Sequence, residues 1–207
     1  MKRPLHILVA LALLVGCTSS VPESRAVAGD YLCVPTEYKV SLPGEGHPGD
    51  GFDPEGGGYG ISIFMEEVLV AQEIPGYKPT VRRGKSLRHQ SLYVGLAPIS
   101  HFQRPLSELG PTHALDEHEL LYATERDGVI WEVVERAGGQ RTHWGTCADL
   151  FTEEGAFDCL RVLAVEDLVL TYTIDQENLQ WYSQIDDLLQ DRVEQWRCDS
   201  GDIPIRL

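Results

Sequence analysis

Leu160 to Ile174 reads LRVLAVEDLVLTYTI, two apolar runs separated by Glu166-Asp167, and this stretch decides the fold. Each run has the length of a strand and is rich in the aliphatic and β-branched residues that strands favour. The acidic pair between the runs is typical of a tight connection. We therefore expect residues 160–165 and 168–174 to form a pair of strands.

The segment that follows predicts a helix. Apolar residues recur there at helical spacing and share one face: Ile185, Leu188, Leu189, Val193 and Trp196. Asp187 and Asp191 lie off that face. Ser183, with Asp186 three residues later, resembles a capping box, so we expect the helix to begin at Ser183. Its apolar face is expected to pack on a sheet.

Further strands are expected on the N-terminal side of this stretch. They are Arg141–Cys147 after a Gly138-Gly139 turn, a hairpin of Glu119–Thr124 with Val129–Glu135, Leu92–Leu96, Ile61–Met65, and a short extended segment around Cys33. Residues 66–73 are ambiguous, and we interpret them as a short helix. Strands followed by a terminal helix predict an α+β fold, with a mainly antiparallel sheet and a C-terminal amphipathic helix packed on it.

The first seventeen residues have the pattern of an export signal. A positive start, Met1-Lys2-Arg3, precedes an apolar run from Leu5 to Val15 that only His6 interrupts. This run is shorter than the roughly 20 apolar residues that a permanent membrane span needs. It ends in Leu14-Val15-Gly16-Cys17, which resembles the lipobox of bacterial lipoproteins.

The resemblance implies a lipid anchor on Cys17. A diacylglyceryl group would be attached to its sulfur, the chain would be cut after Gly16, and an acyl chain such as palmitate would be added to the new amine. Two or three acyl chains hold a protein on a membrane far more firmly than one. Thr18 resembles the outer-membrane class if the cell has two membranes. We expect a protein of the cell envelope on the outer membrane, facing the periplasm.

The rest of the chain divides into a tether and one domain. Residues 1–16 would be a cleaved signal peptide, and residues 17–29, small and polar, a flexible lipidated tether. Residues 30–207 are expected to form a single globular domain. Within it, residues 43–60 are too dense in glycine and proline for a regular element and predict a long loop.

Four cysteines remain besides Cys17. An even number in an oxidising compartment indicates two disulfides, for which three pairings are possible. We favour Cys147–Cys159, which closes a short loop, and Cys33–Cys198, which ties the two ends of the domain. The spacings are unlike those of redox or zinc motifs.

The chain is acidic, with a formal net charge of −15. Cleavage after Gly16 would remove Lys2 and Arg3 and no acidic residue, which makes the charge −17. Such a surface repels nucleic acid, so nucleic acid is excluded as a main partner, whereas a basic protein would suit it. One basic cluster stands out as a possible partner contact: Arg82, Arg83, Lys85 and Arg88.

Candidate catalytic motifs fail on their spacing. The Gly84-Lys85-Ser86 end of a phosphate loop lacks the first glycine, since position 79 is Pro79. His113, Asp116, Glu117 and His118 would approach one another only on a helix, and the glycine-rich loop lacks alternating acidic ligands. We therefore predict no catalytic residue, metal or cofactor.

Two classes of function remain. The first is a non-catalytic, lipid-anchored binding, inhibitor or accessory protein of the periplasm. The alternative is a hydrolase of the envelope whose catalytic groups meet only in the fold.

Overall fold

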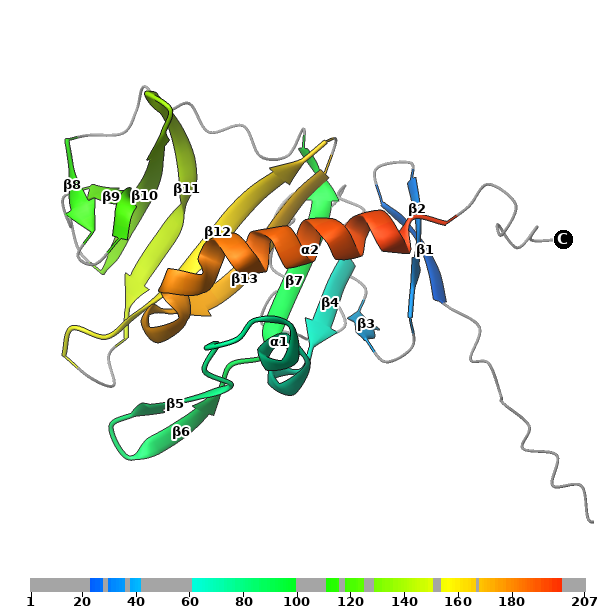
Figure 1. Ribbon diagram of the computed structural model, residues 1–207, viewed down its shortest axis with the longest axis horizontal. Coiled ribbons are helices and arrows are strands. Elements are labelled where there is room, and N and C mark those ends of the chain that lie inside the picture. The colour runs from blue at the N-terminus through cyan, green and yellow to red at the C-terminus, as the bar shows by residue number, and fades with distance from the viewer. Residues whose placement is uncertain are drawn as a thin grey trace, which may run out of the picture.

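The computed structural model describes residues 23–27, 30–35, 38–41, 61–99, 111–115, 118–124, 129–150, 154–166 and 168–198. The expected signal peptide, Cys17 and the loop predicted at 43–60 lie outside them. In this described part, nine strands form one sheet in which every neighbouring pair is antiparallel (Figure 1). In order across the sheet they are β3 (Lys39–Ser41), β4 (Ile61–Met65), β7 (Leu92–Pro98), β13 (Leu168–Asp175), β12 (Phe157–Val165), β11 (Gln140–Asp149), β10 (Ile130–Ala137), β9 (His118–Thr124) and β8 (Thr112–Leu115).

The pair of strands predicted around Glu166-Asp167 lies in the middle of this sheet as β12 and β13. Val165 pairs with Leu168 and Asp158 with Asp175, so the two strands run side by side over their whole length. Nearly every residue of β13 is buried, which explains its continuous apolar sequence. β4 instead alternates, because Ile61, Ile63 and Met65 are buried and the residues between them are not.

A long helix, α2 (Tyr182–Trp196), crosses one face of the sheet (Figure 1). Ile185, Leu189, Val193 and Trp196 are buried against the sheet and Leu188 is partly buried, as the sequence predicts. Each fully buried side chain of this size stabilises the fold by about 1.5–3 kcal/mol. The predicted α+β fold, with a mainly antiparallel sheet and a C-terminal helix packed on it, is confirmed.

The predicted start of this helix is wrong. A 3-10 turn, η3 (Gln176–Trp181), leads directly from β13 into α2, so the helix is already running at Ser183. Asp175 caps the 3-10 turn, since its Oδ1 accepts a hydrogen bond from the Glu177 backbone N–H at 2.9 Å, and α2 begins at Tyr182 without a side-chain cap. The Ser183 hydroxyl donates to the Gln184 side chain instead.

Both predicted disulfides are present. Cys147–Cys159 joins facing residues of β11 and β12, and Cys33–Cys198 joins β2 (Asp30–Val34) to the second residue after the end of α2. The second bond spans 165 residues and the first only 12. In the chain-entropy model these separations correspond to stabilisation by about 5 and about 3 kcal/mol.

Three strand segments were missed or misassigned. β1 (Glu23–Val27) pairs with β2 from Glu23–Val34 to Val27–Asp30, although it lies inside the stretch expected to be a flexible tether. Its sequence is polar and does not predict a strand, but pairing with β2 provides its backbone hydrogen bonds. β3 and β8 were missed for the same reason, because both are short edge strands with little apolar pattern.

One excursion of the chain leaves the sheet between β4 and β7. It contains α1 (Glu67–Glu73), as predicted, and then a two-stranded hairpin, β5 (Thr80–Arg83) and β6 (Ser86–His89), which the sequence did not predict. Because Met65 pairs with Leu92, the excursion starts and ends at one end of the sheet. β13 ends and β12 begins at that same end. We call the β5–β6 hairpin the arm.

Candidate functional site

The arm projects from the body of the protein next to α1 (Figure 1). Its strands turn at Gly84-Lys85, where Gly84 has φ +59°. A two-residue hairpin loop requires a positive φ of this kind, and glycine adopts it without steric cost. The arm carries all four residues of the basic cluster that the sequence singles out as a possible partner contact, so the fold of the arm decides which of them a partner can reach.

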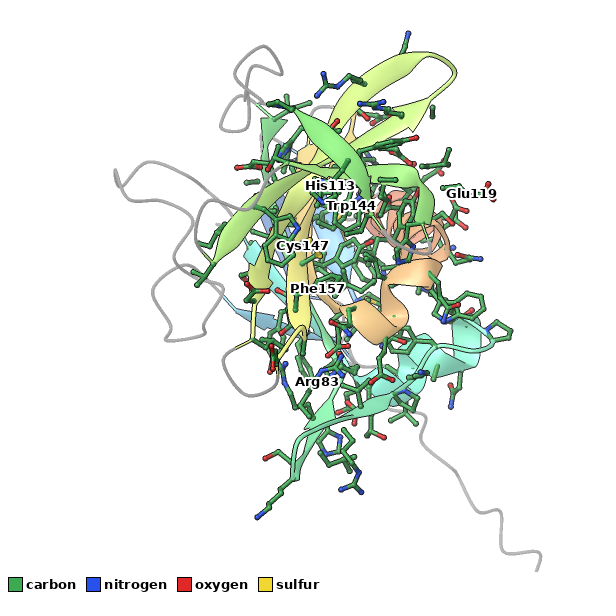
Figure 2. All side chains as sticks on the ribbon, turned by 90° about the vertical axis from the view of Figure 1, so that its left-hand side faces the viewer. Arg83, His113, Glu119, Trp144, Cys147 and Phe157 are labelled. Carbon is green, nitrogen blue, oxygen red and sulfur yellow. A yellow bond between two sulfur atoms is a disulfide. The ribbon has the colours of Figure 1, made fainter. Side chains whose placement is uncertain are left out.

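Arg83, labelled in Figure 2, is the last residue of β5 and lies next to the turn of the arm, yet its side chain is held inside the protein. Its side chain is 5% exposed. Its Nε lies 3.1 Å from Asp175 Oδ2, its Nη2 contacts Asp175 Oδ1, and its Nη1 lies 2.9 Å from Glu177 Oε1. The prediction that Arg83 contacts a partner is therefore wrong, because two carboxylates occupy its guanidinium.

A second arginine of the arm also contacts a carboxylate, although its side chain is 41% exposed. Arg88 Nη2 lies 2.9 Å from Asp158 Oδ2. Asp158 and Asp175 face each other across β12 and β13, so the end of the central strand pair presents two adjacent carboxylates. These two aspartates and two arginines, together with Glu177, are called the clamp.

The electrostatics of the clamp follow from burial. Loss of solvent raises the pKa of Asp175, and the nearby Asp158 adds to this rise, while the Glu177 N–H and Arg83 oppose it. Glu177 is more exposed, and its pKa is lowered, first by the hydrogen bond from Lys78, whose Nζ lies 2.7 Å from Glu177 Oε2. Through Glu177, the clamp thus joins the buried pair Arg83–Asp175 to the more exposed pair Lys78–Glu177.

Neutral contacts complete the root of the arm. The Asn178 side chain is buried and pairs with both backbone groups of Lys78, accepting from its N–H at 2.8 Å and donating to its C=O at 3.0 Å. The buried Tyr77 hydroxyl donates to the Gln90 backbone carbonyl. An isolated two-stranded hairpin is marginally stable at best in water, so these contacts and the clamp are what make the arm a persistent element.

The tip and outer face of the arm remain accessible. Arg82 and Leu87 face each other across the two strands, and both are exposed, Leu87 by 57%. Lys85 in the turn is exposed as well. Val81, one residue before Arg82, points to the opposite face and is buried. The arm therefore has an inner face that fixes it and an outer face that presents two cations and one apolar side chain.

Beside the arm, three polar side chains form a cluster that resembles a catalytic triad in composition only. Glu67 accepts from the Ser91 hydroxyl at 2.5 Å and lies 2.7 Å from His89 Nδ1. A nucleophilic triad places the histidine between the hydroxyl and the acid, so that the imidazole removes the hydroxyl proton. Here the carboxylate is in the middle, and the serine proton is donated to it.

The same order recurs on β10 and β11. Glu132 Oε2 lies 2.7 Å from His143 Nε2 and accepts from the Thr146 hydroxyl at 3.1 Å. Again the acid separates the hydroxyl from the imidazole. Neither cluster has the geometry of an activated nucleophile, so neither supports the alternative of an envelope hydrolase.

A buried ion pair under α2 has a structural role. Arg161 on β12 binds Asp186 of α2 through Nε at 3.0 Å and Nη2 at 2.6 Å, and its Nη1 donates to the Trp144 carbonyl at 2.8 Å. The Tyr172 hydroxyl donates to Asp186 Oδ1 at 2.8 Å. Burial raises the pKa of Asp186, and Arg161 opposes the rise. Asp186, which its spacing from Ser183 predicts to be part of a helix cap, is instead one half of this ion pair.

The metal candidates do not come together. His113 lies on β8 and His118 on β9, in strands and not on the helix that the hypothesis required, and Asp116 and Glu117 lie outside the described residues. In the part of the chain that the structure describes, no three histidine, cysteine, aspartate or glutamate side chains are grouped as metal ligands would be.

The chain was also compared with known proteins. It matches no protein-family model, no curated protein and no solved structure. None of the described helices combines the length and apolar character needed to cross a bilayer.

Proposed function

We propose that this protein is a lipid-anchored binding or accessory protein of the cell envelope, and that the exposed outer face of its arm contacts the partner. The lipobox resemblance around Cys17 supports the anchor, and the arm supports the contact. The observation that carries the proposal is the division of the basic cluster: Arg83 is buried and Arg88 is paired with Asp158, while Arg82 and Lys85 are exposed, as is Leu87.

The chemistry of the arm indicates what the partner offers. Arg82 and Lys85 are suited to bind carboxylates of the partner, and Leu87 is suited to contact a small apolar patch between those carboxylates. Exposed ion pairs add only about 0.2–1 kcal/mol each, so affinity must come chiefly from the apolar contact and from the fixed geometry of the hairpin. A partner protein with an acidic surface around an apolar patch fits this pattern.

The contact can be tested by site-specific photo-crosslinking in the envelope of the cell that makes the protein. A photoreactive phenylalanine analogue replaces Leu87 in the full-length chain, and Leu120 on β9, a leucine that is 45% exposed against 57% for Leu87, is the matched control position. We expect one discrete crosslinked species from position 87, and its loss when Arg82→Glu and Lys85→Glu are added. The proposal fails if position 87 gives only the products that position 120 gives.

The anchor is tested separately. Cys17→Ser removes the only sulfur that the lipobox resemblance assigns to the lipid. We expect the variant to leave the membrane fraction and to lose incorporation of an alkyne-labelled palmitate, with the two internal disulfides unchanged. Full membrane retention of the variant, with label still incorporated, would refute the anchor without affecting the arm.

A further inference from the structure

A groove lies between the end of α1 and the N-terminal half of α2. Its volume is about 280 Å³. Four apolar side chains line it, Ile74 and Pro75 from the end of α1, and Trp181 and Leu188 from η3 and α2. None of the arm's exposed residues takes part, so the groove is a different surface from the one proposed above.

The size of the groove limits what it holds. Pockets for small molecules usually measure about 300–1,000 Å³, and this groove lies just under that range. A single long side chain with some flanking backbone fits better than a cofactor or a drug-sized ligand. The apolar lining suits the aliphatic stem of such a side chain.

Two carboxylates at the groove define the charge of its occupant. Asp187 and Asp191 are exposed, line the groove one helical turn apart on α2, and have no ion-pair partner among the described residues. Like charges at this spacing destabilise a helix by about 0.2–0.5 kcal/mol. The third acid of the groove, Glu73, is already paired with Arg192 at 2.8 Å. A cation placed between Asp187 and Asp191 would turn their repulsion into attraction.

We propose that the groove binds one lysine or arginine side chain of a peptide segment from a partner protein. The aliphatic stem lies on Pro75, Trp181 and Leu188, and the cationic end lies between Asp187 and Asp191. The proposal adds a second, acidic contact to a chain whose overall charge is −15 and favours basic partners.

The probe is the peptide Ac-Gly-Ser-Arg-Leu-Ser-Gly-NH2, titrated into the full-length protein in a zwitterionic detergent at low salt. A second peptide carries citrulline, the neutral isostere of arginine, in place of the arginine. Binding is followed by the ¹⁵N-resolved indole N–H resonance of Trp181, whose Nε1 has no hydrogen-bond partner among the described residues. We expect saturable shifts with the arginine peptide and at least tenfold weaker binding of the citrulline peptide.

Matched variants separate the groove from general charge attraction. The double variant Asp187→Asn with Asp191→Asn is expected to weaken binding of the arginine peptide about fivefold or more, which is the effect of losing two partly exposed ion pairs. Glu119→Gln with Glu194→Gln removes the same charge from exposed positions outside the groove and is expected to change binding less than twofold. Thermal unfolding of both double variants confirms that they are folded.

Four results would overturn the proposal. They are the absence of saturable shifts, equal binding of the two peptides, equal loss in the two double variants, and binding of free spermidine as tight as that of the arginine peptide. The last result would assign the groove to a small polyamine. None of them affects the crosslinking test of the arm, so the two proposals stand or fall separately.

Discussion

Two buried arginine–aspartate pairs in this protein have nearly the same geometry and different consequences. Arg161–Asp186 lies between the sheet and α2, where both side chains are less than 10% exposed and further partners are the Tyr172 hydroxyl and a backbone carbonyl. Arg83–Asp175 is equally buried, but it opens through Glu177 to Lys78 at the surface. The first pair orients the core. The second fixes an element that projects from it.

The largest effect is expected at the Arg161–Asp186 pair. Arg161→Met leaves Asp186 buried without its cation, and removing one partner of a buried pair typically costs about 3–5 kcal/mol. Urea unfolding should show this loss across the whole domain. Arg161→Met combined with Asp186→Leu should recover most of it, because both charges are then absent. A single variant as stable as the wild type would mean that the pair is not buried as described.

A smaller and more local loss is expected at the clamp. Arg83→Met should cost about 2–3 kcal/mol, because Asp175 keeps the Glu177 N–H and Glu177 keeps Lys78. Hydrogen exchange should become faster in residues 80–90 and stay slow in 168–174. Equal acceleration in both segments would show that the arm does not move independently of the sheet.

Acid should separate the two pairs as well. The pKa of Glu177 is lowered in the folded state, so its contribution is present above about pH 4.5 and is lost as the pH falls below that value. The pKa of Asp186 is raised, so its contribution grows as the pH falls through that raised pKa. The raised pKa of Asp175 acts in the same direction as that of Asp186, so the two pairs differ through Glu177. As the pH falls below 4.5, exchange in the arm should therefore rise relative to exchange under α2. The opposite order would contradict the assignment of Glu177 to the clamp.

The smallest effect on stability is expected at the tip. Arg82→Ser, Lys85→Ser and Leu87→Ser together change only exposed side chains, so the free energy of unfolding should change by less than about 0.5 kcal/mol. The same triple variant should abolish partner contact. A loss of stability similar to that of Arg83→Met would instead give the tip a structural role.

The sequence predicts the sheet and α2 well because apolar periodicity specifies both. It misses the arm because two of its four β5 residues are arginines and the carboxylates that bind Arg83 and Arg88 lie 92 and 70 residues away in the chain. Only the pairing of Asp158 with Asp175 brings those carboxylates together. A basic run therefore looks like a solvated loop until the fold supplies its partners.

The sequence does contain an indication of the Arg161–Asp186 pair under α2. Arg161 interrupts an apolar strand, and Asp186 follows Ile185 on the side of the helix that turns toward the sheet. A charge inside an apolar pattern requires a partner of opposite sign, since an unpaired buried charge is too costly. That reasoning would have paired Arg161 with Asp186, whereas a capping box requires only local spacing and was satisfied by coincidence.

The most direct test of the account is photo-crosslinking from position 87 in the wild-type background and in Arg83→Met. If the clamp holds the arm for partner contact, the discrete crosslinked species should be present in the first and lost in the second, with α2 and the sheet still folded in both. The account is contradicted if position 87 yields no discrete species in the wild-type background, or if Arg83→Met yields it undiminished.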